Sequence, residues 1–322
     1  MASRHTILVT AWLILFPPFA TAQSFHFVIL GDRTGSTQPG VYEEVWKEAA
    51  AENPAFVTTI GDMIQGYNDA TAESEWQAVK PLLDTYRKIP FYPSPGNHDI
   101  WSEAAERVFR KYAGHEPHYS FDFQQAHFTI LDNSRSDDFS AAELAFLEED
   151  LRAHAGQPVK FILSHKPSWL VSAVARNSDF AIQRLARKYG VQTVIAGHLH
   201  QMLHVDFDGV TYVSMGSAGG HLRASKRYED GWFFGYALVQ VDGVTVKFQI
   251  KELKAPFGEG RVTRLRDWGA SGLVKKDAAA ASAYRFPNPT LLTQMTLIGV
   301  RSNFSRTWLS LLGSSGGAPL GF

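Results

Sequence analysis

The chain has no cysteine among its 322 residues. A chain without cysteine has no disulfide framework, no thiolate nucleophile and no zinc-thiolate site, so any metal must bind to nitrogen and oxygen ligands. It also lacks an excess of either charge, because 31 Lys and Arg residues stand against 32 Asp and Glu residues. This balance gives no specific signal for binding to nucleic acid or to an anionic membrane.

Hydrophobic residues make up 45% of the chain, which allows a sizeable core and excludes a disordered chain. We expect one main domain over residues 23–254, followed by a C-terminal extension, partly irregular or disordered, over residues 255–322. The extension contains “DAAAASAYRFPNP”, which is typical of a linker, and it ends in the low-complexity stretch “SSGGAPLGF”. Residues 290–312 are partly apolar but carry Arg301 and Arg306, which favours a peripheral amphipathic helix over a membrane span.

The first 22 residues have the features of a secretory signal peptide. Arg4 and His5 form a short basic start, residues 6–16 form an apolar run, and “ATA” precedes Gln23. We expect cleavage after Ala22, export to the periplasm or the extracellular space, and no transmembrane anchor afterwards. The competing interpretation is an uncleaved membrane anchor, but the apolar run is short for a bilayer span and two prolines follow it.

Short runs rich in β-branched and aromatic residues alternate with segments of helical periodicity. These patterns predict strands at residues 25–30, 55–60, 89–95, 127–131, 159–163 and 192–196. They predict helices at residues 39–53, 71–88, 102–114, 140–156 and 178–190. After Gly197 the pattern changes to hairpins, with Asp-Gly turns at 208–209 and 242–243. The fold class is therefore α/β, with a layered and mixed sheet arrangement.

The predicted strands end just before side chains that can bind metals or move protons. These clusters are Gly31-Asp32, Gly61-Asp62, Gly96-Asn97-His98-Asp99, Ser164-His165 and Gly197-His198-Leu199-His200. Each cluster alone has an ordinary alternative, since Gly-Asp is common in turns and a single His often has a structural role. Ligands of open α/β sheets bind outside the carboxyl ends of the strands, so the five clusters should converge on one site.

These clusters, in this order, resemble the signature of the calcineurin-like metallophosphoesterases, a superfamily that includes the purple acid phosphatases. The resemblance rests on Asp32, “GD” at 61–62, “GNHD” at 96–99, His165 in “ILSHKP” and “GHLH” at 197–200. It covers residues 25–250, and it implies a two-sheet mixed β-sandwich flanked by helices, in four layers.

The resemblance also implies a site for two divalent or trivalent metal ions, and the ligand types suit Mn, Fe or Zn. Asp62 would bridge the two ions, Asp32 and His200 would hold the first, and Asn97, His165 and His198 would hold the second. His98 would act on the leaving-group oxygen as a general acid or charge stabiliser, with Asp99 as a candidate to orient it. The implied reaction is in-line attack of a metal-held hydroxide on phosphorus.

Two positions depart from the family pattern. The usual Asp-x-His is Asp32-Arg33-Thr34 here, and a threonine hydroxyl is a poor substitute for an imidazole. Gln65 stands where many members have an Asp that orients the catalytic His, and where purple acid phosphatases have a Tyr ligand. Tyr67 lies two residues further on, and it could bind metal only in a rearranged loop, the alternative being a packing or hydrogen-bonding role.

Arg33, residues 215–223 and Trp169 can each be interpreted in two ways. Arg33 could contact the substrate phosphate, because a guanidinium matches phosphate oxygens, or it could form a surface salt bridge. The stretch “MGSAGGHLR” at 215–223, with His221 and Arg223, could close over the substrate or simply connect two strands. Trp169 could flank the pocket or cover the core.

We therefore expect an exported phosphoesterase acting on a small phosphorylated substrate, with monoesters favoured over diesters and nucleotides. One alternative is a catalytically silent binding protein with a degenerate first metal site. Another is a mononuclear metal hydrolase that acts on a different ester, which would follow if Thr34 left the first site empty.

Overall fold

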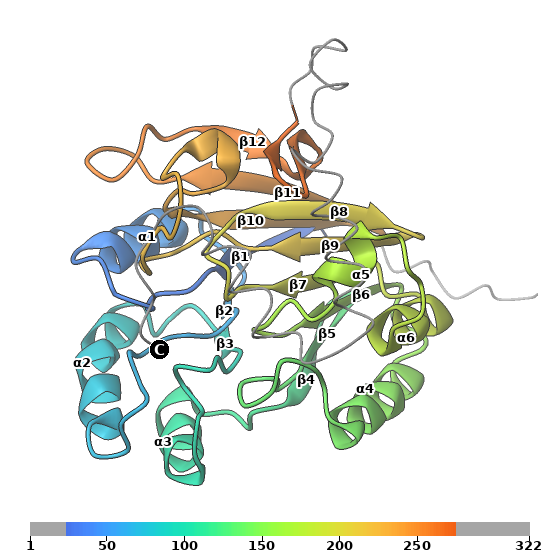
Figure 1. Cartoon of the computed structure of the whole chain (residues 1–322), viewed down its shortest axis with the longest axis horizontal. Helices are drawn as coiled ribbons and strands as arrows, with labels where there is room; N and C mark the ends of the chain where they lie inside the picture. Colours follow the sequence, from blue (N-terminus) through green and yellow to red (C-terminus); the bar gives the residue numbers. More distant parts are fainter. Residues whose placement is uncertain (1–23, 275–322) are drawn as a thin grey trace, which may run out of the picture.

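The computed structural model describes residues 24–274 and contains two six-stranded mixed sheets with helices on both sides (Figure 1). The first sheet contains, in spatial order, β12 (Val262–Arg264), β11 (Thr245–Glu252), β10 (Gly235–Asp242), β1 (Phe25–Leu30), β2 (Val57–Thr59) and β3 (Phe91–Pro93). The second contains β4 (Tyr119–Phe123), β5 (Ala126–Ile130), β6 (Val159–Leu163), β7 (Thr193–Ala196), β9 (Val210–Ser214) and β8 (Leu203–Phe207). A short hairpin of β13 (Trp268–Gly269) and β14 (Gly272–Leu273) follows.

Six α-helices lie on the outer faces of the sheets within the described residues. They are α1 (Val41–Ala51), α2 (Ala72–Thr85), α3 (Glu103–Ala113), α4 (Ala141–Ala153), α5 (Leu170–Val174) and α6 (Ala181–Tyr189). Two 3₁₀ turns, η1 (Tyr228–Asp230) and η2 (Leu265–Asp267), follow β9. Helices α1 to α3 lie on one flank in Figure 1 and α4 to α6 on the other, which confirms the predicted four-layer α/β sandwich.

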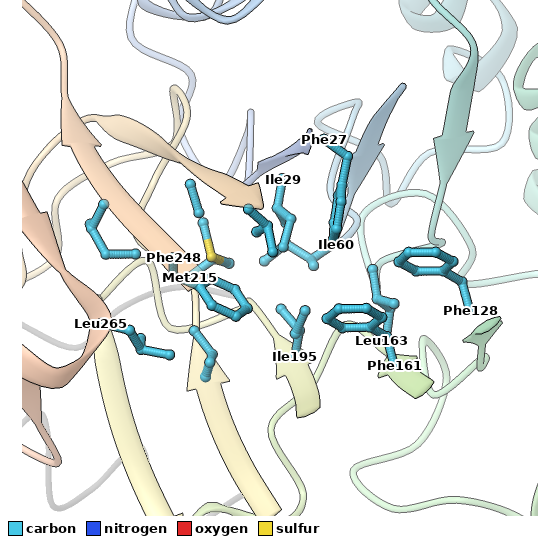
Figure 2. Close-up of a cluster of buried hydrophobic side chains, with 14 of the residues drawn as sticks. Phe27, Ile29, Ile60, Phe128, Phe161, Leu163, Ile195, Met215, Phe248 and Leu265 are labelled. Atoms are coloured by element: carbon cyan, nitrogen blue, oxygen red, sulfur yellow. The ribbon is translucent and has the colours of Figure 1, made fainter. Parts of the chain in front are cut away.

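The core between the two sheets is rich in aromatic rings (Figure 2). Phe27 of β1 meets Phe128 of β5 and Phe161 of β6 edge-on, with ring centroids 5.2 and 5.5 Å apart. All three rings are fully buried. Because burial of apolar surface is the main favourable term in folding, this cluster holds the two sheets face to face.

Separate apolar clusters attach the helices. Trp46 of α1 and Trp76 of α2 are buried against the first sheet together with Phe109 of α3. Trp169 and Leu151 belong to the corresponding cluster between the second sheet and its helices. Trp169 is fully buried and packs against the Tyr212 ring at 4.9 Å, so it covers the core.

Serine residues cap the starts of α3 and α4. The Ser102 hydroxyl accepts a hydrogen bond from the Ala105 amide, and the Ser140 hydroxyl accepts one from the Glu143 amide. A serine in this role satisfies an amide that the first helical turn leaves without a backbone partner. Gly114 and Gly190 end α3 and α6 in the left-handed conformation.

The directions of the strands determine where the candidate ligands lie. Strands β1, β2 and β3 are parallel to one another, and so are β5, β6, β7 and β9. The carboxyl ends of each parallel block therefore lie at one edge of its sheet, and every cluster of candidate ligands follows one of these ends.

Some elements were not predicted from the sequence. Strand β4 was missed although Tyr119, Phe121 and Phe123 alternate with polar residues, which is the period of a strand. The short helix α5 spans only five residues, and β12 lies beyond residue 254, where we placed the end of the domain. Leu265 and Trp268 also pack into the core between the sheets, so the packed part continues past that boundary. The signal peptide at residues 1–22 and the extension at residues 275–322 lie outside the described residues. Among residues 24–274, no helix combines the length and apolar character that crossing a bilayer would need.

Candidate metal centre

The structure brings together the six side chains that were predicted as metal ligands. They form two groups that share Asp62, namely Asp62 with His165 and His198, and Asp32 with Asp62 and His200. Within each group the candidate ligand atoms lie within 4.8 Å of one another. Asn97 joins the first group, since its Oδ1 lies 2.8 Å from His165 Nε2. A carboxylate shared by two ligand groups has the position that a bridging ligand requires.

The candidate ligand atoms point toward one another and not toward hydrogen-bonding groups outside the centre. His165 Nε2 lies 3.1 Å from His198 Nδ1 and 3.3 Å from Asp62 Oδ1. His200 Nε2 lies 3.7 Å from Asp32 Oδ1. Carboxylate oxygens, an amide oxygen and neutral imidazole nitrogens gain little from meeting in a dry interior unless a proton on His165 or a metal ion lies between them.

Backbone carbonyls fix which nitrogen of two imidazoles is free. His165 Nδ1 donates to the Ile60 carbonyl at 2.7 Å, and His200 Nδ1 donates to the His221 carbonyl at 2.8 Å. Each bond leaves the Nε2 lone pair directed at the centre, which is the usual arrangement of a metal-binding histidine.

Three buried side-chain atoms of the centre have no hydrogen-bond partner among residues 24–274. They are Asp32 Oδ2, Asp62 Oδ2 and His200 Nε2. An unsatisfied polar atom in the interior costs about 1–3 kcal/mol, so three such atoms around one space need an explanation. A bound metal ion would satisfy them, and the oxygen and nitrogen donor set suits that group.

Burial and mutual charge set the protonation of these groups. Burial lowers the pKa of His200 to about 3 and also holds the pKa of His198 well below its usual range. Burial alone would raise the pKa of Asp62, but the charge of His165 outweighs it and holds that pKa below its usual range. Burial also disfavours the charged form of His165, yet Asp62 raises its pKa to about 9. Two neutral imidazoles and an ionised carboxylate are forms that bind metal, and metal would displace the His165 proton.

The backbone adopts an uncommon conformation at the ligands. Asp62, His198 and His200 all have positive φ, at 60°, 66° and 61°. Residues other than glycine rarely adopt these angles, and such positions cluster at functional sites because the surrounding structure must hold them. At Gly96 a Cβ would lie 2.2 Å from Asp62 Oδ1, so only glycine allows this loop to approach the shared carboxylate.

Asp99 has contacts different from those expected. Its carboxylate accepts hydrogen bonds from the amides of Asp62, Met63 and Gly96 at 2.7–2.9 Å. No hydrogen bond joins it to the His98 imidazole within residues 24–274. A direct orienting contact from Asp99 to His98 is therefore not observed among these residues, because both carboxylate oxygens bind the loop that carries Asp62.

His98 is oriented by a backbone carbonyl instead. Its Nδ1 donates to the Gln65 carbonyl at 2.5 Å, and its amide donates to Asp62 Oδ1 at 3.0 Å. The imidazole is partly exposed and meets the Tyr67 ring edge-on at 4.8 Å. Fixing Nδ1 leaves Nε2 as the nitrogen that can exchange a proton with a substrate.

The two positions that depart from the family pattern bond to each other. The Thr34 hydroxyl donates to Gln65 Oε1 at 2.7 Å and accepts from the Thr37 hydroxyl at 3.1 Å. The Thr34 hydroxyl thus donates to the loop that follows β2 and accepts within its own loop. Neither residue supplies the imidazole that is missing from the usual Asp-x-His.

Tyr67 has a role that spacing alone did not reveal. Its hydroxyl accepts a hydrogen bond from Asn97 Nδ2 at 2.5 Å, which turns Asn97 Oδ1 toward His165. Its side chain is 55% exposed and its φ is 62°. The structure thus supports the hydrogen-bonding alternative for Tyr67.

Arg33 lies beside the centre but is engaged elsewhere. Its Nη1 donates to the Met63 carbonyl at 2.8 Å, and its guanidinium lies over the Tyr42 ring at 5.7 Å. It makes no ion pair within the described residues, so the salt-bridge alternative is not observed. These contacts tie the first ligand loop to the second.

Comparisons with known proteins agree with this geometry. The sequence model of the calcineurin-like phosphoesterase family matches residues 25–202, which is more than half of the chain. Human tartrate-resistant acid phosphatase type 5 is 23% identical over 271 residues, which cover 70% of this chain and 82% of the relative. Purple acid phosphatase 15 of Arabidopsis thaliana is 25% identical over 170 residues, covering 44% of this chain and 32% of the relative.

Solved structures share the fold at low sequence identity. The purple acid phosphatase PPD1 from yellow lupin has a TM-score of 0.58 and 15% identity, covering 80% of this chain and 57% of that one. GAP50, described as the anchor in the inner membrane complex of Plasmodium, has a TM-score of 0.54 and 15% identity. The match covers 81% of this chain and 93% of GAP50. The family match and the acid phosphatase relatives together show that this chain belongs to the calcineurin-like phosphoesterase family and is a metal-dependent phosphoric ester hydrolase.

Proposed function

We propose that the protein hydrolyses phosphomonoesters at a centre that holds two metal ions. The observation that carries this proposal is the convergence of six ligand side chains, three of which present a buried atom that has no hydrogen-bond partner within residues 24–274. Asp62 belongs to both ligand groups and would bind both ions, while Asp32 and His200 would hold one and Asn97, His165 and His198 the other. When bound, the ions act as Lewis acids on the phosphoryl group and lower the pKa of an attacking water.

The side chains around the centre would position the reaction. The Asn97 amide is held by the Tyr67 hydroxyl, and Asp62 is held by the Asp99 carboxylate through backbone amides. Such supporting contacts fix the ligands within a narrow range of geometries before the substrate arrives. His98, oriented by the Gln65 carbonyl, would donate a proton from Nε2 to the leaving-group oxygen.

Monoesters are favoured because two curated relatives are named acid phosphatases. A diesterase or nucleotide hydrolase would use the same ligands, and it differs in how the outer part of the substrate is bound. A substrate panel separates these functions, and it should contain phosphomonoesters, phosphodiesters, nucleotides and phospholipid head groups, each with Mn, Fe or Zn. Turnover confined to diesters or nucleotides would contradict the monoester proposal.

A catalytically silent role is the alternative from another class. GAP50 shares this fold and is described as an anchor, so the fold by itself does not distinguish catalysis from binding. The retained ligand set and the partly exposed His98 favour catalysis in this chain. A protein that binds metal but turns over no ester in the panel would support the silent role.

We also propose that the enzyme is exported and acts outside the cytoplasm. The proposal rests on the predicted signal peptide at residues 1–22, which lies outside the described residues. The expected mature protein begins at Gln23. N-terminal sequencing of the protein recovered from the medium or the periplasm tests it, and an intact N-terminus in a membrane fraction would support the anchor alternative instead.

A further inference from the structure

The glycine loop, residues 215–223, is attached directly to the metal centre. The amides of Ala218 and Gly220 donate to the Asp32 carbonyl at 3.0 and 3.1 Å. The His221 amide donates to the Gly35 carbonyl at 3.1 Å, and the His221 carbonyl accepts the bond from His200 Nδ1 at 2.8 Å. The loop is thus fixed to both segments that carry the ligands of the first ion.

The approach of this loop is too close for a side chain at its centre. A Cβ at Gly220 would lie 2.0 Å from the Thr34 carbonyl oxygen and 2.5 Å from His200 Cε1. Only glycine permits the backbone to lie against the imidazole in this way. The residues that follow Gly220 are therefore held at the edge of the centre, and Arg223 is the cation among them.

Arg223 is an exposed guanidinium beside the ligand His200. A Cβ built on Gly35 would lie 3.7 Å from Arg223 Nη2 and 3.1 Å from His200 Nε2, so the two nitrogens border one small space. Arg223 makes no ion pair anywhere in residues 24–274. A cation that faces a metal ligand and has no acidic partner is free to bind an anion.

The other nearby cations already have partners. Arg33 is engaged with the Met63 carbonyl and the Tyr42 ring, and Lys166 Nζ lies 3.3 Å from Asp137 Oδ1. Of the two arginines near the ligand loops, Arg223 is therefore the better candidate to bind an anion.

We propose that Arg223, rather than Arg33, binds the phosphoryl oxygens of the substrate and of the phosphate product. This inference rests on the proposed function, because it concerns the substrate of the same site. The planar guanidinium would donate two parallel hydrogen bonds to the phosphoryl oxygens on the side of His200. The glycine loop then serves as the platform that fixes this donor relative to the metal ligands.

The test measures the binding of inorganic phosphate to the metal-loaded protein. Arg223→Ala and Arg223→Lys are compared with the wild type by titration calorimetry and by competitive inhibition of ester hydrolysis. Arg227→Ala is the matched control, because Arg227 is an exposed arginine of the neighbouring segment that lies 3.8 Å from Asp230. Metal content is measured in every variant, and it should not change.

We expect Arg223→Ala to weaken phosphate binding by about 10- to 100-fold, the range for losing hydrogen bonds to a charged group. The phosphate affinity of Arg223→Lys should lie between those of the wild type and Arg223→Ala. An ammonium keeps the charge but cannot donate two parallel hydrogen bonds. Arg227→Ala should bind phosphate like the wild type. Unchanged phosphate binding in Arg223→Ala, or equal weakening in Arg227→Ala, would overturn the inference.

The calorimetric arm separates this inference from the proposed function. If the wild type binds phosphate through Arg223 but hydrolyses no phosphoester, the proposed function fails and the inference stands. If the wild type hydrolyses monoesters and Arg223→Ala retains full phosphate affinity, the inference alone fails.

Discussion

Two regions of this molecule gather histidine and aspartate side chains, and they differ in how their lone pairs are used. In the metal centre, Asp32 Oδ2, Asp62 Oδ2 and His200 Nε2 are buried and have no hydrogen-bond partner in the described part of the chain. The second cluster consists of Asp122, His127, Asp150 and His154 on strands β4 and β5 and at the end of helix α4. The candidate ligand atoms of Asp122, His127 and His154 also lie within 4.8 Å of one another.

The second cluster satisfies its own hydrogen bonds. His127 Nδ1 lies 2.7 Å from Asp122 Oδ1, and His127 Nε2 lies 2.9 Å from Asp150 Oδ2. Asp150 also accepts from the hydroxyls of Ser120 and Thr129. No atom of this cluster is among the buried unpartnered side-chain atoms of residues 24–274. Residue type and proximity therefore do not distinguish the two clusters, whereas unsatisfied donor atoms that face one space do.

The largest expected difference between the two regions is in turnover and metal content. Asp62→Asn removes the carboxylate charge shared by both ligand groups, so it should lower kcat by more than about 10³-fold, above the cost of losing one positioned donor. It should also reduce metal content. Asp122→Asn, the matched change in the second cluster, should leave kcat within about twofold. Steady-state kinetics and elemental analysis of both variants measure this, and similar losses in the two would remove the distinction.

His98→Ala sharpens the comparison inside the metal centre, because it separates catalysis from metal binding. Loss of a positioned general acid should slow hydrolysis by about 10²–10⁴-fold while metal content stays intact. Nitrophenyl phosphate should be affected less than an alkyl phosphate, since its leaving group needs little protonation. His165→Ala should instead lower metal occupancy and slow both esters alike. Equal slowing of both esters by His98→Ala, or loss of metal from it, would show that its role is misassigned.

The second cluster should affect stability rather than activity. Burial opposes charge on His127, but the adjacent carboxylates of Asp150 and Asp122 outweigh it and raise the pKa of His127. Removing one partner of a buried ion pair costs about 3 kcal/mol, so His127→Asn should lower the free energy of unfolding by about that amount at pH 6.

The pH dependence of this effect has a definite sign. A histidine whose pKa is raised by folding stabilises the protein fully below its unfolded pKa of 6.5, and the stabilisation is lost as pH rises through the higher folded value. The difference between wild type and His127→Asn should therefore be largest near pH 6 and shrink toward pH 9. Urea unfolding at both values measures it, and a difference that grows with pH would refute the charged state of His127.

The smallest expected effect is at Thr34. Because the Thr34 hydroxyl is engaged with Gln65 and Thr37, Thr34→Val should change metal affinity by less than about threefold, while removing a hydrogen bond worth about 1 kcal/mol of stability. Calorimetric metal titration of the metal-stripped protein measures this. A tenfold loss of affinity would show that Thr34 is a ligand and that the ligand group of Asp32 and His200 is larger than we describe.

The sequence predicted the strand ends and their ligands because glycine followed by a polar side chain after an apolar run is a local signal. Asp32, Asp62 and His165 follow β1, β2 and β6 as expected. The contacts of Asp99 with backbone amides, in place of the expected contact with His98, could not be predicted. They depend on how two loops approach each other in space. The Thr34–Gln65 bond and the position of Arg223 are likewise contacts between distant segments. Periodicity also gave no sign of β12, whose pairing with β11 lies beyond the expected domain end.

The most direct test of the account is to count and locate the metal ions in the purified protein. Elemental analysis gives the number per chain, and anomalous diffraction from metal-loaded crystals gives their positions. We expect two ions, both bound to Asp62, and none between Asp122, His127 and His154. A single ion, or an ion in the second cluster, would contradict the claim that unpartnered buried donor atoms mark the metal centre of this phosphoesterase.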